Sequence, residues 1–121
     1  MKSFLVMAAF IIISILGGCY YDKQAFLDTT SACDTTIVTY SVAVNPVITA
    51  SCAGCHSGAN APLGIKLDVF ADLSTVALNG RLLGALTHSP GFSPMPKNGA
   101  KLSDCNIDKI SKWISLGAPD N

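Results

Sequence analysis

The chain has 121 residues, and its 8 lysines and arginines balance its 8 aspartates and glutamates, so the formal net charge at pH 7 is zero. This length fits one domain, and the balance of charges excludes the basic surface expected of a nucleic-acid-binding protein. The hydrophobic share of 50% is high for a soluble domain, but much of the excess lies in residues 1–18.

Residues 1–18 predict an export signal, because Lys2 precedes an apolar run over 4–16 that is shorter than the ~20 residues of a bilayer span. The sequence Leu-Gly-Gly-Cys19 follows and resembles a bacterial lipobox, in which the cysteine thiol receives diacylglycerol. Cys19 would then be a lipidated N-terminus that anchors the protein to a membrane of the cell envelope, facing the periplasm or the cell surface. The alternative is an ordinary signal peptide or an uncleaved anchor, with Cys19 there by chance.

Residues 19–39 are polar, and we expect a lipidated tether there, with an extended lead-in as far as about Val44. Asn45 and Pro46 then form a typical helix opening, with Asn as the cap and Pro at the first helical position. We expect the folded domain to occupy residues 40–121 and its first helix to lead into two closely spaced cysteines.

These cysteines belong to the sequence Cys52-Ala-Gly-Cys55-His56. Cys-x-x-Cys-His is the covalent attachment motif for haem c. The spacing lets both thiols add to the two vinyl groups at one porphyrin edge, and the adjacent histidine lies beneath the iron as an axial ligand. The motif predicts one covalent haem bound by Cys52, Cys55 and His56.

Two other kinds of site use similar residues. In a thioredoxin-like redox site, Cys52 and Cys55 would follow a strand of an α/β pattern, which this sequence does not show. A structural zinc site built from Cys52, Cys55 and His56 or His88 would need ligands from a second cluster, and the sequence has no second pair of this spacing.

The rest of the chain predicts helices and loops without strands. Residues 57–64 have the composition of a loop, and the apolar positions over 67–78 are mostly helical in spacing, with a break at Asn79-Gly80. Residues 81–86 predict a second short helix.

The segment 88–102 is too rich in proline and glycine for regular structure. Beyond it, Ser103 is a helix cap before an amphipathic helix that ends at Gly117, with Pro119 following. The expected fold class is therefore all-α.

A six-coordinate haem iron needs a second axial ligand, usually Met or His. Met95 is the only methionine beyond residues 1–18, and it lies between Pro94 and Pro96, which fix φ on both sides. We therefore predict Met95 as the sixth ligand. His88 is the competing ligand; otherwise it caps the preceding helix or bonds a haem propionate.

The chain has 5 cysteines, and each has a predicted fate. Cys19 goes to lipid, and Cys52 and Cys55 go to haem. Cys33 and Cys105 remain as a disulfide pair, which an oxidising compartment favours. The alternative is two buried thiols.

Several of these features together resemble the class I cytochrome c domain, in particular small single-haem lipoproteins of Bacteroidetes-type bacteria. The residues that carry the resemblance are Pro46, Cys52-Ala-Gly-Cys55-His56, Met95-Pro96, Gly99, Leu102-Ser103, Ile110, Trp113-Ile114 and Gly117-Ala118-Pro119. The resemblance implies a cytochrome c-like helical domain around one haem, in which the helix before the motif crosses the last helix and brings Val47 or Ile48 near Trp113.

The resemblance also implies His56 and Met95 as axial ligands, and one-electron transfer with redox partner proteins of the cell envelope rather than enzymatic catalysis. One alternative is a haem-based sensor or binding protein in which Met95 is displaced by a small ligand, with a peroxidase-like activity as a related version. Another is a docking subunit of a larger membrane complex.

Overall fold

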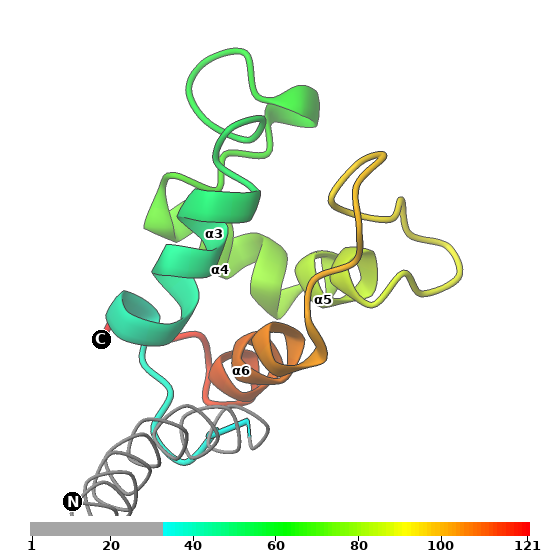
Figure 1. Cartoon of the computed structure of the whole chain (residues 1–121). Coiled ribbons are helices and arrows are strands. Elements are labelled where there is room, and N and C mark those ends of the chain that lie inside the picture. Colours follow the sequence, from blue (N-terminus) through cyan, green and yellow to red (C-terminus); the bar gives the residue numbers. More distant parts are fainter. Residues whose placement is uncertain (1–32) are drawn as a thin grey trace, which may run out of the picture. The chain divides into compact units, whose positions relative to one another are not determined.

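The computed structural model describes residues 33–121, and every regular element in this part of the chain is helical (Figure 1). In chain order the elements are η1 (Tyr40–Val44), α3 (Asn45–Ser51), η2 (Pro62–Gly64), α4 (Phe70–Leu78), α5 (Arg81–Leu86) and α6 (Asp104–Ser115). The prediction of an all-α domain is confirmed for these residues. The export signal, Cys19 and most of the tether lie outside the described residues.

The chain is already helical before Asn45, so the predicted extended lead-in as far as Val44 is wrong. Tyr40–Val44 form a turn of π-helix that begins at Thr39, and Asn45 has helical angles of φ −56° and ψ −41°. Asn45 is therefore inside a continuous helix and does not cap it. Valines are poor helix formers because χ1 is restricted, but Val44 is fully buried, and this burial offsets the weak propensity.

The start of this helix is held by the far end of the described chain. The backbone N–H of Tyr40 donates to the Asn121 side-chain oxygen at 2.8 Å, and that of Ser41 donates to the Asn121 carbonyl at 2.9 Å. These bonds satisfy N–H groups that a helix start leaves without an internal partner. The Thr39 hydroxyl also accepts from the N–H of Val42 at 3.3 Å, so the start of the helix is capped both by a neighbouring side chain and by the distant Asn121.

Helices α4 and α5 confirm the predicted break at Asn79-Gly80. Gly80 has φ +81°, which suits a residue without Cβ, and the Asn79 side chain accepts from the N–H of Arg81 at 3.0 Å. The segment between α5 and α6 is irregular, as the prolines and glycines predict. In Figure 1 this segment, and the one between α3 and α4, both extend beyond the ends of the helices.

Both predicted ends of α6 are also confirmed. The Ser103 hydroxyl accepts from the N–H of Asn106 at 3.3 Å. At the other end Gly117 has φ +92°, and the N–H of Ala118 donates to the Trp113 carbonyl at 3.1 Å. This arrangement is typical of a glycine-terminated helix.

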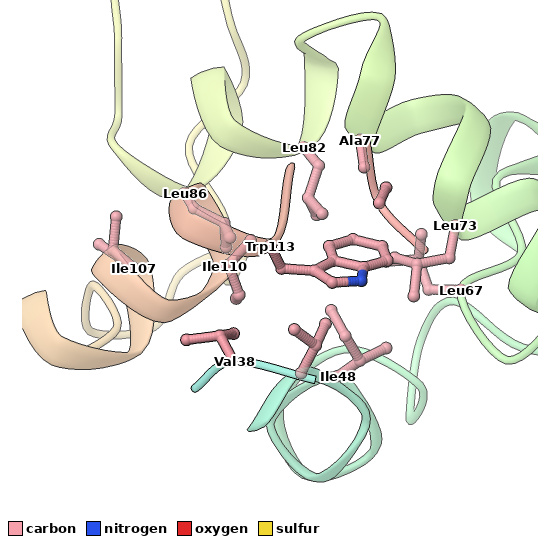
Figure 2. Packing of buried hydrophobic residues seen from close by; sticks show 12 residues of the cluster. Val38, Ile48, Leu67, Leu73, Ala77, Leu82, Leu86, Ile107, Ile110 and Trp113 are labelled. Carbon is pink, nitrogen blue, oxygen red and sulfur yellow. The ribbon is translucent and has the colours of Figure 1, made fainter. Parts of the chain in front are cut away.

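Trp113 lies at the centre of the buried core, with side chains of α4 and α5 on one side of its indole ring and Ile48 on the other (Figure 2). The core comprises Val38, Val44, Ile48, Leu67, Leu73, Ala77, Leu82, Leu86, Ile107, Ile110, Trp113 and Ala118. Helix α6 packs against η1 and α5. The predicted proximity of Ile48 and Trp113 is therefore present.

Three aromatic rings connect the first helix to α4 and α6. The ring of Tyr40 stacks on Trp113 with centroids 5.9 Å apart and meets Phe70 edge-on at 4.8 Å. Burial raises the pKa of the Tyr40 phenol, and Asp120 adds to this effect. The cluster fixes the helix that leads into the cysteine motif against the rest of the core.

Candidate functional site

The Cys-x-x-Cys-His residues continue α3 as tight turns. The N–H groups of Cys52 and Ala53 both donate to the Ile48 carbonyl at 2.9 Å. The N–H groups of Cys55 and His56 donate to the Cys52 carbonyl at 3.1 and 2.9 Å. These hydrogen bonds fold the backbone of the motif into turns, and they thereby fix the Cα positions from which the two thiols and the imidazole extend.

Both thiols of the motif are free, and Cys52 is half-buried whereas Cys55 is exposed. Burial raises the pKa of the Cys52 thiol. Two free thiols on one turn are able to add to two neighbouring vinyl groups, which is the chemistry that the spacing predicts.

His56 is held by the chain segment that returns from the loop. Its ring Nδ1 lies 3.1 Å from the Ile65 carbonyl, and its own carbonyl accepts from the N–H of Leu67 at 2.7 Å. A carbonyl oxygen only accepts, so Nδ1 is the donor of this bond, and in the neutral ring the lone pair is therefore on Nε2. Histidines that bind metals commonly show this outer hydrogen bond, which fixes the tautomer and the ring.

The predicted sixth ligand, Met95, is held by both of its peptide groups. Its N–H donates to the Ala85 carbonyl at 3.1 Å, and its carbonyl lies 3.0 Å from Nε2 of His88. The residue is partly buried, in the irregular segment between α5 and α6. Its backbone is therefore fixed to the carboxyl end of α5.

His88 caps α5 through its backbone, because its N–H donates to the Ala85 carbonyl at 3.3 Å and the N–H of Ser89 donates to the Gly84 carbonyl at 2.9 Å. Its side chain is engaged elsewhere, since its Nε2 donates to the carbonyl of Met95. Serving as an axial ligand through that nitrogen would require this bond to break. The structure thus brings together the two residues that the sequence offered as competing ligands, and it gives them different surroundings.

Large apolar side chains are exposed on both loops that carry the predicted ligands. Leu63, in the loop after His56, is 90% exposed, and Phe92, in the loop of Met95, is 42% exposed. Exposed apolar side chains at a candidate site favour an apolar ligand over a small ion.

The remaining cysteines of the described residues are engaged differently. Cys33 and Cys105 are disulfide-bonded, whereas Cys52 and Cys55 are not. This division is the one that the sequence analysis expected. The predicted lipidation at Cys19 lies outside the described residues.

The rival sites find little support between residues 33 and 121. No strand precedes the motif there, so the sheet of a thioredoxin-like site is missing from this part of the chain. No group of three or more His, Cys, Asp or Glu side chains in the same residues is arranged to hold a metal ion, as a tetrahedral zinc site requires. Haem c needs no such convergence, because the thiols bond to the porphyrin edge and only the histidine reaches the iron.

None of the helices within residues 33–121 is long and apolar enough to cross a membrane. No protein-family model, curated protein or solved structure matches the chain.

Sequence reasoning missed the groups that hold the ligands in place. The carbonyls of Ile65 and Ala85 are backbone atoms, which every residue has, so no sequence signal marks them. The sequence feature that indicates a close contact between the predicted helix 81–86 and the loop of Met95 is Gly84, a glycine inside that helix. A Cβ at this position would lie 2.6 Å from the ring of Phe92.

Proposed function

We propose that this chain is a c-type haem protein with a cytochrome c-like fold. Within that class, the residues favour a monohaem electron carrier with His56 and Met95 as axial ligands. The observation that carries the proposal is the hydrogen bond from Nδ1 of His56 to the Ile65 carbonyl, in a histidine directly after two free thiols at haem c spacing. It leaves Nε2 as the ligating nitrogen of a ring that cannot easily rotate.

Each residue of the proposed site has one role. Cys52 and Cys55 would hold the haem covalently, His56 would supply a nitrogen ligand to the iron, and Met95 would supply a thioether ligand. When bound, the haem supplies a one-electron ferric–ferrous couple, which His/Met ligation biases toward the reduced state. Met95 also closes the sixth position to water and small molecules, so electron exchange at the haem edge is favoured over catalysis.

The proposed setting is the cell envelope, with Cys19 as the lipid anchor and envelope redox proteins as partners. The disulfide-bonded state of Cys33 and Cys105 supports export, because disulfides persist in oxidising compartments. The balanced charge of the chain does not favour a partner of strongly opposite charge.

The proposal is tested by producing the full chain in a host with haem c maturation machinery. We expect the haem to survive acid–acetone extraction in the wild type and to be extracted from the double variant Cys52→Ala/Cys55→Ala. We also expect the oxidised wild type to show the red-end absorption band of a sulfur–ferric iron bond. Met95→Ala should abolish this band, whereas Lys97→Ala, a change at an exposed residue of the same loop, should keep it.

Two results would contradict the proposal. If covalent haem is present but the red-end band is missing from the wild type, Met95 is not the ligand, and His88 ligation or an open site for a small ligand takes its place. If no haem is attached at all, the proposal is wrong as a whole.

A further inference from the structure

The carbonyl of Met95 has an unusual hydrogen-bond donor. In most loops such a group bonds to backbone or water, but here the donor is Nε2 of His88, at 3.0 Å. The N–H of Met95 is fixed separately by the Ala85 carbonyl at 3.1 Å. Both peptide groups that flank the proposed ligand are thus fixed, one by helix α5 and one by a side chain.

The backbone of His88 ends helix α5: its N–H donates to the Ala85 carbonyl at 3.3 Å, and that of Ser89 donates to the Gly84 carbonyl at 2.9 Å. His88 has φ +57°, in the left-handed region that few residues other than Gly, Asn, Asp and His adopt. This conformation turns the chain directly after α5, and the imidazole then reaches Met95 on the far side of the turn. Of the two hydrogen bonds to Met95, only this one depends on the type of side chain.

We propose that His88 is a positioning residue for Met95: its hydrogen bond holds the loop closed so that the Met95 thioether occupies the sixth position, and without it the loop opens to small ligands. This inference rests on the proposed function, because the position of Met95 matters only if the thioether binds the iron. It assigns His88 a role other than that of the competing ligand.

Two amide substitutions separate the hydrogen bond from backbone strain. In His88→Gln, the side-chain nitrogen is as many bonds from Cα as Nε2 of histidine, so the donor to the Met95 carbonyl is kept. In His88→Asn the nitrogen is one bond shorter and does not reach, although asparagine adopts positive φ more readily than glutamine does. If backbone strain decides the outcome, His88→Gln is impaired more than His88→Asn. If the hydrogen bond decides it, His88→Asn is impaired more.

The experiment uses the haem-loaded full chain with imidazole as the probe ligand. We expect His88→Asn to weaken the red-end band, to lower the reduction potential and to bind imidazole about tenfold more tightly, because a lost hydrogen bond raises the population of the open loop. His88→Gln and the surface control Lys97→Ala should retain wild-type values of all three.

The outcomes separate this inference from the proposed function. If the wild type shows the sulfur–iron band and His88→Asn leaves the band, the potential and imidazole affinity unchanged, His88 is not a positioning residue, but the electron carrier stands. The same conclusion follows if His88→Gln is impaired more than His88→Asn, since strain then explains the effect. If the wild type lacks the band, the ligation by Met95 that underlies both proposals is wrong.

Discussion

The ring of Phe92 lies directly on the backbone of Gly84: a Cβ placed on Gly84 would be 2.6 Å from Cδ2 and 2.7 Å from Cγ of that ring. The N–H of Ser89 also donates to the Gly84 carbonyl, at 2.9 Å. Gly84 therefore joins helix α5 to the loop that carries Met95. A glycine inside a helix is unfavourable by about 1 kcal/mol relative to alanine, so the close approach of the ring explains why alanine does not serve here.

The first prediction follows from this contact. Gly84→Ala should lower the free energy of unfolding by about 1–3 kcal/mol, because displacing the Phe92 ring outweighs the better helix propensity of alanine. Urea denaturation of the wild type and the variant measures the change.

A double-mutant cycle with Phe92→Ala supplies the control for this prediction. Once the ring is absent, the same Gly84→Ala change should be neutral or stabilising, because only helix propensity remains. If Gly84→Ala is equally destabilising in both backgrounds, the ring is not the cause and the packing argument is wrong.

The second prediction concerns the polar edge of the central indole. The Nε1–H of Trp113 donates to the Pro119 carbonyl at 2.9 Å, and this bond holds the segment after α6 against the core. Trp113→Phe retains an aromatic ring but leaves that carbonyl without its donor, and we expect a loss of about 1–3 kcal/mol in the free energy of unfolding. Trp113→Ala should cost about 3–5 kcal/mol, because it also leaves a cavity.

An exposed position on the same helix serves as the reference for these variants. Asp108 lies on α6 and faces solvent, so Asp108→Asn should change the unfolding free energy by no more than about 0.5 kcal/mol. A Trp113→Phe variant as stable as this control would show that the hydrogen bond to Pro119 contributes nothing.

The helices differ in how far local sequence signals predict them. The helix at Asp104–Ser115 was predictable because its cap, apolar face and terminal glycine are all local. The turn at Tyr40–Val44 was missed although Thr39, directly before it, is a local cap whose hydroxyl accepts from the N–H of Val42. The N–H groups of Tyr40 and Ser41 are satisfied by Asn121, and a local pattern cannot report bonds to a residue so distant in sequence.

In the candidate site, too, the sequence predicts some features and not others. The motif identifies Cys52, Cys55 and His56 by residue type and spacing, and Met95 by its rarity. The contacts that fix His56 and Met95 are made by the carbonyls of Ile65 and Ala85 and by the imidazole of His88. The sequence therefore predicts which side chains form the candidate site, but it does not predict the contacts that hold them.

The third prediction concerns the disulfide-bonded residues Cys33 and Cys105. Closing a loop of about 70 residues contributes roughly 4 kcal/mol in the loop-entropy model. We expect the double variant Cys33→Ala/Cys105→Ala to unfold at a lower urea concentration than the wild type. Reductant should bring the wild type to the level of the variant and leave the variant unchanged, because thioether bonds to haem resist reduction. Equal urea midpoints for the oxidised and the reduced wild type would refute the stabilising role.

The fourth prediction counts thiols. The proposed function requires that all 5 cysteines of the chain be engaged in the mature exported protein: Cys19 by lipid, Cys52 and Cys55 by haem, and the disulfide-bonded Cys33 and Cys105 as the structure has them. Iodoacetamide added to the denatured, unreduced protein should therefore label no cysteine, and prior reduction should expose Cys33 and Cys105 alone. Labelling of Cys19 before reduction would contradict the lipid anchor and leave the haem assignment intact.

The same chemistry applied to a chain made without haem c maturation tests the geometry of the motif. Both Cys52 and Cys55 should then be labelled without reduction, because both thiols are free in the absence of the cofactor. Under native conditions Cys55 should react first, since it is exposed, whereas Cys52 is half-buried and burial raises its thiol pKa, which lowers the fraction of reactive thiolate. Peptide mapping over time gives the order. Faster labelling of Cys52 would mean that the turn presents the two thiols differently from the structure, and a chain from the maturing host that is labelled at both positions would show that no thioether forms.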